Sequence, residues 1–182
     1  MADLVTGPVN TGVTDLNIPG VRFERIPSSS DPRGSFAKPY TRPLDSPDKI
    51  LEVFWSYSTT GVVRGLHVQG PRSGSAKSVF LTEGRVLDVI LDLRRSSHTY
   101  GHFRCFVLDP GVSLHIPHGC AHGFQALEPS RMVYLCDAPY DPASDHGVRF
   151  DSLGIPWPIP APTVSERDLS LPPWAAYETP FP

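Results

Sequence analysis

Short runs of alternating apolar and polar residues make up much of the chain, and Gly, Pro, Ser and Asp residues separate them. This pattern is typical of the strands of a β-sandwich or barrel. In the clearest run, residues 85–93, the odd-numbered Leu and Val side chains share one face, while Val86, Asp88, Ile90 and Asp92 share the other. The pattern predicts strands at residues 21–26, 50–58, 77–82, 85–93, 102–108, 112–116, 123–127 and 131–136.

The segments around these strands complete the predicted organisation. Glu83-Gly84 is a tight turn, so we expect residues 85–93 to pair antiparallel with residues 77–82. Residues 1–20 lack a clear period and are expected to form an extended arm. Residues 156–182 contain eight prolines and cannot form a central strand. Their aromatic side chains suggest that this segment packs over the barrel, with one short helical turn at residues 165–169.

Composition narrows the class of protein. The 182 residues are one domain's worth of sequence, with 40% hydrophobic and 19% charged residues, enough for one sizeable core. The 21 prolines and 15 glycines argue against a helical bundle. The net charge of −3, without a basic run, speaks against binding to nucleic acid or to an anionic membrane surface. We therefore expect a single all-β domain.

The lack of a recognisable targeting signal and the pattern of cysteines predict a cytoplasmic protein. The first residues carry no cationic region followed by an apolar core, and no stretch reaches the roughly 20 apolar residues of a membrane span. The three cysteines, Cys105, Cys120 and Cys136, include no CxxC pair, so neither a disulfide scaffold nor a thiolate zinc site is indicated. Buried free thiols are expected.

Three segments place polar groups among apolar residues. Arg64 and His67 would face opposite sides of a regular strand, but Gly65 permits a bulge that turns both towards one cavity. His122 follows a loop that would bring it into the barrel mouth. Tyr134 shares a face with Met132 and would point inward. Each of these residues also has an alternative without a functional role: an arginine on the surface, a histidine in the core and a tyrosine in the core. A metal site is not favoured, because the His-x-His spacing of metal-binding barrels is missing.

Together the segments resemble a known family, the dTDP-4-dehydrorhamnose 3,5-epimerases. The likeness runs in order from about residue 21 to residue 170. Each motif alone is weak, but the ordered set is specific. The matching motifs are DPRGSF at 31–36, VVRGLHVQ at 62–69, GRVLDVILDLR at 84–94, SHTYG at 97–101, IPHGCAHGF at 116–124, YLCDAPYDP at 134–142, GIPWP at 154–158 and VSERD at 164–168.

The resemblance implies a fold and an activity. It implies a cupin-type jelly-roll β-barrel, with an extended N-terminal arm (1–20), a core (21–155) and a proline-rich C-terminal segment (156–182), and a homodimer without metal or other cofactor. The substrate would be a dTDP-linked 4-keto-6-deoxy sugar, inverted at the carbons beside the ketone. Such inversion needs a base, an acid on the opposite face, and positive charge near the enolate oxygen.

Roles for individual residues follow from their match to the family. His67 would be the general base, Asp168 would fix its tautomer, Tyr134 would be the acid, and Lys77 would stabilise the enolate. Arg33 and Arg64 match diphosphate contacts. Further matches to substrate-contacting positions are His122, Tyr140, Asp145, Arg167 and Gln69.

Two departures concern the nucleotide-binding region. Lys38 stands where the family commonly has a glutamate, and Glu52-Val53-Phe54-Trp55 replaces a polar Q-x-N-type stretch. Phe54 and Trp55 would either stack on a base or pack in the core, with packing slightly favoured. Three alternatives to a 3,5-epimerase stay open: a single-site 3- or 5-epimerase, a non-catalytic sugar-nucleotide binding protein, and a metal-dependent barrel enzyme.

Overall fold

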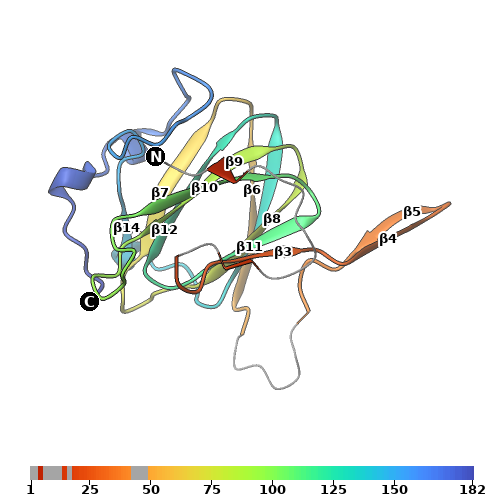
Figure 1. Ribbon diagram of the computed structural model, residues 1–182, viewed down its shortest axis with the longest axis horizontal. Coiled ribbons are helices and arrows are strands. Elements are labelled where there is room, and N and C mark those ends of the chain that lie inside the picture. Colours follow the sequence, from red (N-terminus) through yellow and green to blue (C-terminus); the bar gives the residue numbers. More distant parts are fainter. Residues whose placement is uncertain (1–3, 6–13, 16–17, 42–48) are drawn as a thin grey trace.

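Two six-stranded sheets that face each other form the body of the protein (Figure 1). The computed structural model describes residues 4–5, 14–15, 18–41 and 49–182. Sheet I contains, in spatial order, β1 (Leu4–Val5), β10 (Phe103–Leu108), β9 (Val86–Asp92), β12 (Cys120–Ala126), β7 (Val63–Gln69) and β14 (Asp145–Gly147). Sheet II contains β2 (Thr14–Asp15), β3 (Arg22–Arg25), β11 (Val112–Ile116), β8 (Lys77–Glu83), β13 (Ser130–Cys136) and β6 (Glu52–Ser58). This arrangement confirms the expected all-β jelly roll.

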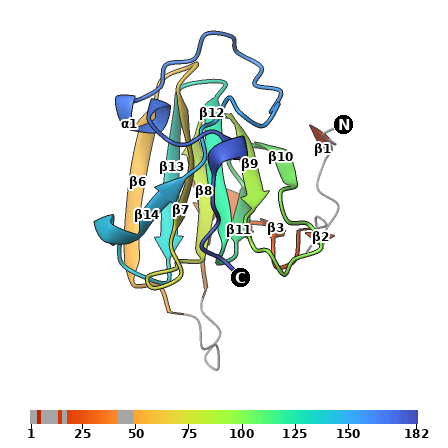
Figure 2. The same cartoon turned by 90° about the vertical axis from the view of Figure 1, so that its left-hand side faces the viewer.

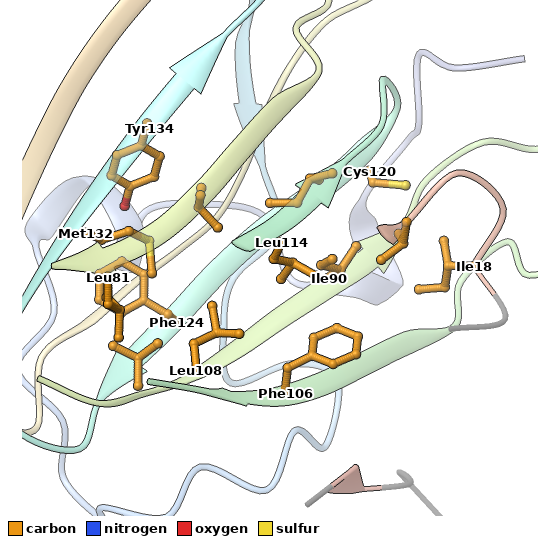
Figure 3. Packing of buried hydrophobic residues seen from close by; sticks show 14 of the residues in the cluster. Ile18, Leu81, Ile90, Phe106, Leu108, Leu114, Cys120, Phe124, Met132 and Tyr134 are labelled. Carbon is orange, nitrogen blue, oxygen red and sulfur yellow. The ribbon is translucent and has the colours of Figure 1, made fainter. Parts of the chain in front are cut away.

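The main core lies between the two sheets. Figure 3 shows side chains from both sheets, among them Phe106, Phe124, Leu114 and Met132, meeting in this layer. Each is at most 3% exposed. Burial of large apolar side chains is the dominant favourable term in folding, so this layer fixes how the sheets face each other. Tyr134 lies in the same layer, on the inward face that its spacing from Met132 predicted.

The predicted pairing of the two strands that flank Gly84 is wrong. β8 pairs with β11 and β13 in sheet II, whereas β9 pairs with β10 and β12 in sheet I. Both faces of β9 are buried, so this strand occupies an interior position between two partners. The chain crosses between the sheets at Gly84, where φ is +85° and an added Cβ would lie 2.2 Å from the Pro129 carbonyl oxygen. The glycine therefore marks a sheet-to-sheet crossover instead of a hairpin.

Other boundaries differ from the sequence pattern. β12 begins at Cys120, three residues before the predicted start, and β7 occupies a segment for which no strand was predicted. A hairpin of β4 (Ser28–Asp31) and β5 (Gly34–Ala37) projects from the body (Figure 1). Its residues are exposed and carry no apolar alternation, so periodicity gave no signal for it.

The proline-rich C-terminal segment packs against sheet I, as expected (Figure 2). Trp157, Trp174, Tyr177 and Phe181 join the apolar cluster on the outer face of this sheet. The segment contains the predicted helical turn, α1 (Glu166–Leu169), and it follows the 3-10 turn η1 (Pro142–Ser144) and contains a second, η2 (Trp174–Ala176). The N-terminal arm falls mostly outside the described residues. Among those described, no helix is long and apolar enough to cross a membrane. The three cysteines are free and buried, as predicted.

Candidate active site

A pocket of about 450 Å³ opens between the two sheets. Strands β7 and β12 of sheet I contribute one wall, and strands β6, β8 and β13 of sheet II contribute the facing wall. The pocket collects most of the side chains that the sequence singled out. Those that line it are Arg64, His67, Gln69, Lys77, His122, Tyr134, Tyr140, Asp145 and Arg167.

His67 and Asp168 form a hydrogen-bonded pair at the wall of sheet I. The His67 Nε2 atom lies 2.7 Å from Oδ1 of Asp168, which is 3% exposed, and the Gly65 N–H donates to Oδ2 at 3.0 Å. Burial opposes ionisation of Asp168, but the hydrogen bonds from His67 and Gly65 outweigh it and hold the carboxyl pKa below its usual value. An anionic Asp168 therefore accepts from Nε2–H, which leaves Nδ1 of His67 as the basic ring nitrogen.

Helix α1 places Asp168 at this point. The Ser165 hydroxyl caps the helix by accepting from the Asp168 N–H at 3.1 Å. A serine cap satisfies a backbone donor that would otherwise lack a partner at the helix start. The cap therefore positions the carboxylate that orients His67.

Gly65 allows Arg64 and His67 to reach the same pocket. Its φ is +121°, and an added Cβ would lie 2.5 Å from Cα of Gly123 on the neighbouring strand. The register between β7 and β12 shifts at this point, between His122 and Phe124. This irregularity matches the bulge predicted at Gly65, and it changes the strict alternation of side chains along β7.

Tyr134 projects into the pocket from β13 in the facing sheet. It is 8% exposed, and its hydroxyl lies 3.3 Å from the Ser56 hydroxyl on β6. Burial raises the pKa of the Tyr134 hydroxyl well above its usual value, although the Ser56 contact works in the opposite direction. The phenol thus stays protonated and able to donate a proton across the pocket from His67.

Lys77 contributes a cationic side chain to the pocket wall that sheet II forms. It lies on β8, opposite Cys136 in the β8–β13 register. Loss of hydration lowers the pKa of its ammonium group, while nearby Cys136 and Asp88 favour the charged form. Burial also raises the pKa of the Cys120 thiol to about 12, so this pocket cysteine remains a protonated thiol at neutral pH.

A second histidine–carboxylate pair is more deeply buried than the pair of His67 and Asp168. The His122 Nε2 atom is 2.8 Å from Oδ2 of Asp88, and the two residues are 3% and 0% exposed. Burial lowers the His122 pKa, although Asp88 opposes the shift. Among the residues that the structure describes, none forms a hydrogen bond with Oδ1 of Asp88. Asp88 received no role from the sequence, yet a carboxylate between Val86 and Ile90 on an apolar strand face was a usable signal.

Polar side chains at the pocket mouth form a connected group. Asp145 accepts from the Tyr140 hydroxyl at 3.0 Å and pairs with the Arg167 guanidinium. The Asp145 contact is the main reason that the pKa of the Tyr140 hydroxyl is raised. Gln69 accepts a hydrogen bond from the Asp141 N–H at 2.7 Å, so its side-chain amide holds the adjoining loop in place. The group leaves part of the Arg167 guanidinium exposed to the mouth.

Two predicted substrate-binding residues lie away from the pocket. Arg33 and Lys38 lie on or beside the projecting β4–β5 hairpin, and Arg33 pairs with Asp31 there. Nothing in the described protomer brings them to His67. His118, which received no role from the sequence, is exposed and pairs with Asp137 outside the pocket. Within the described parts of the chain, no three His, Cys, Asp or Glu side chains form a metal-ligand group.

The fold and the pocket define a jelly-roll protein that presents a histidine–carboxylate pair and a phenol to one small-molecule cavity. Comparison with known proteins gives the family. The model of the dTDP-4-dehydrorhamnose 3,5-epimerase family matches residues 15–176. The chain belongs to this family of isomerases, as its ordered motifs indicated.

Individual relatives include enzymes of both specificities. The chain is 37% identical to a dTDP-4-dehydrorhamnose 3-epimerase of Streptomyces niveus, over 84% of this chain and 79% of that one. It is 40% identical to a dTDP-4-dehydrorhamnose 3,5-epimerase of Mycolicibacterium smegmatis, over 64% of this chain and 60% of that one. The crystal structure of the 3,5-epimerase from Sulfolobus tokodaii superposes with a TM-score of 0.85 at 32% identity, covering 94% of this chain and 98% of that one.

Proposed function

We propose that this protein epimerises a dTDP-linked 4-keto-6-deoxyhexose at C3 and C5, the two carbons beside its ketone. One observation carries the proposal: His67 and Tyr134 enter the same pocket from facing sheets. A sugar ring held between the sheets would have a base on one face and a proton donor on the other. That is the geometry an inversion through an enolate requires.

His67 is the base in this mechanism. Its Nδ1 takes the proton from the carbon beside the ketone, and the electron pair of the broken C–H bond moves into the enolate. Asp168, held by Gly65 N–H and the α1 cap, stabilises the resulting imidazolium. The Lys77 ammonium neutralises charge on the enolate oxygen. Tyr134 then gives its hydroxyl proton to the opposite face of the carbon, and the inverted centre is complete.

Charged side chains at the mouth suit the diphosphate. Arg64 and Arg167 line the pocket there, and guanidinium groups bind phosphate oxygens through paired hydrogen bonds. His122, Tyr140, Asp145 and Gln69 contact the sugar nucleotide in the same proposal. Lys38 and Arg33 reach a nucleotide through the projecting hairpin of a second protomer, in a homodimer. Three buried free thiols fit a reducing, cytoplasmic location.

A single-site epimerase is the second candidate. The 37% identical relative is a 3-epimerase, and this observation favours the alternative. C3 and C5 flank the same ketone, so one base, one acid and one ammonium group serve either reaction. The way the sugar lies between His67 and Tyr134 decides between them.

The decisive experiment follows deuterium into dTDP-4-keto-6-deoxyglucose. The purified protein is incubated with this sugar nucleotide in deuterated water, and C3 and C5 are monitored by NMR. Deuterium at both carbons, with inversion, supports the 3,5-epimerase, and deuterium at one carbon supports the single-site enzyme. His67→Asn should abolish incorporation. His118→Asn removes the exposed histidine that pairs with Asp137 outside the pocket and should leave incorporation unchanged. Absence of label above the His67→Asn level would contradict the proposal.

A further inference from the structure

Strand β6 contributes the apolar ring of Phe54 to the pocket wall. Phe54 lies on this strand, where the family resemblance leads one to expect a polar residue. Side chains alternate along a strand, and the structure separates the two aromatic neighbours accordingly. Phe54 lines the pocket, whereas Trp55 faces outward, where the Arg131 guanidinium lies 4.5 Å from its ring centre. The core packing favoured for both residues from the sequence is therefore wrong: they are 43% and 61% exposed.

Phe54 stacks on Tyr134. The two residues lie directly opposite each other in the β6–β13 register. Their ring centres are 4.5 Å apart and their planes differ by 10°. The next residue on the same face of β6, Ser56, contacts the Tyr134 hydroxyl. One strand therefore supports both the ring face and the hydroxyl of the phenol.

The contacts of Tyr134 restrict how its ring can move. The His122 ring approaches it edge-on, with centres 6.2 Å apart and planes at 70°. Stacked and edge-on aromatic contacts are attractive beyond the burial of their area. β6 is the outermost strand of sheet II, with β13 as its neighbour. The orientation of the phenol thus depends on an edge strand, through a ring that is itself half exposed.

We propose that Phe54 is a positioning residue for the acid Tyr134, and that its stacking determines how often the enolate is reprotonated with inversion. The inference rests on the proposed function, because it assigns the acid role to Tyr134. A hydroxyl must lie within hydrogen-bond reach of the enolate carbon to deliver a proton. When the phenol swings away, the His67 imidazolium exchanges its proton with solvent and then reprotonates the enolate on the original face, so the C–H bond is labelled without inversion. Removal of the stacked ring therefore shifts the balance from inversion to exchange.

The test compares Phe54→Leu, Phe54→Tyr and Trp55→Leu with the wild type. Leucine keeps apolar volume without a ring to stack, and tyrosine keeps the ring. Trp55→Leu removes an aromatic residue from the other face of the same edge strand and controls for its stability. Each protein is incubated with dTDP-4-keto-6-deoxyglucose in deuterated water. Deuterium exchange, inversion, kcat and KM are measured.

We expect Phe54→Leu to lower kcat for inversion about tenfold and to raise the ratio of exchange to inversion by about the same factor, with KM nearly unchanged. In both Phe54→Tyr and Trp55→Leu, the ratio of exchange to inversion should stay at the wild-type value. An unchanged ratio in Phe54→Leu would overturn the inference. So would a raised KM with an unchanged kcat, because that result would make Phe54 a binding platform for the substrate.

A second measurement does not depend on turnover. When 3-fluorotyrosine replaces Tyr134, the chemical shift of its ¹⁹F resonance depends on the Phe54 ring that stacks on it. Phe54→Leu should shift this resonance, while Trp55→Leu should not. A wild-type protein inactive on the sugar nucleotide would refute the proposed function, whereas an unmoved resonance in Phe54→Leu would refute the stacking itself. The two failures are therefore distinguishable.

Discussion

His67 and Asp168 lie 101 residues apart in the chain, yet Nε2 of the imidazole donates to Oδ1 of the carboxylate at 2.7 Å. The C-terminal segment makes this possible, because it crosses sheet I and returns α1 to strand β7. The carboxylate fixes which ring nitrogen carries a proton, and so leaves Nδ1 as the basic nitrogen. The relationship makes the tautomer of the proposed base a property of the tertiary structure.

The first prediction concerns this tautomer. Asp168→Asn should lower kcat for epimerisation by roughly 10²–10⁴-fold, because an amide can neither hold the tautomer nor stabilise the imidazolium. Steady-state kinetics with the sugar nucleotide measure the loss. Asp137→Asn is the matched control, since it changes the carboxylate of the exposed His118 pair, and it should retain full activity. Equal losses in the two variants would show that the pairing at His67 has no special role.

The second prediction separates the acid from the base. Tyr134→Phe removes the proposed proton donor and leaves His67 in place, so exchange of substrate C–H with deuterated water should persist while inversion falls at least about 100-fold. NMR of the recovered sugar gives both quantities. Tyr177→Phe is the control: this hydroxyl lies outside the pocket and has no hydrogen-bond partner in the described part of the chain, so its removal should leave both rates unchanged. Full inversion by Tyr134→Phe would mean that another group is the acid.

The third prediction concerns the stability of the deeper pair. His122→Ala leaves the fully buried carboxyl of Asp88 without its hydrogen-bond partner, and leaving such a group unsatisfied costs about 1–3 kcal/mol or more. Urea unfolding at neutral pH measures the free energy of unfolding. His118→Ala breaks an exposed pair and should cost no more than about 1 kcal/mol. Similar losses in the two variants would contradict the account of Asp88 as a buried carboxyl that depends on its hydrogen bond to His122.

The fourth prediction concerns pH. Burial opposes ionisation of Asp92, but hydrogen bonds from Arg94, Ser97 and Thr99 outweigh it, so the folded-state pKa of this carboxyl is lowered. A depressed folded pKa contributes stability above the unfolded pKa, near 4, and this contribution is lost as pH falls through the folded value. Wild type should therefore exceed Asp92→Asn in stability at about pH 6, and the gap should narrow towards about pH 3. Urea unfolding across this range provides the check, and a gap that widens on acidification would reverse the argument.

Much of the fold could be predicted from local pattern. The alternation in β9, the proline-rich tail and the short turn at Ser165 each follow from the preferences of a few adjacent residues, and the structure confirms all three. The crossover at Gly84 could not be predicted in this way. A glycine turn between two strands fits a hairpin or a change of sheet, and the choice depends on packing against Pro129, which is distant in the chain.

The resemblance to the family also pointed to the pocket residues, including His67, Lys77 and Tyr134, which the fold gathers into one cavity. The contact of Asp88 with His122 and the position of Phe54 in the cavity were set by the tertiary structure alone. The partners of these two residues, His122 and Tyr134, lie on other strands, and such contacts depend on strand order and register. The sequence by itself determined the strand pattern, the C-terminal covering segment and the chemical groups available for acid-base work. Only the tertiary structure decided that the proposed base and acid enter one pocket from facing sheets, because this relation depends on two sheets closing over one core.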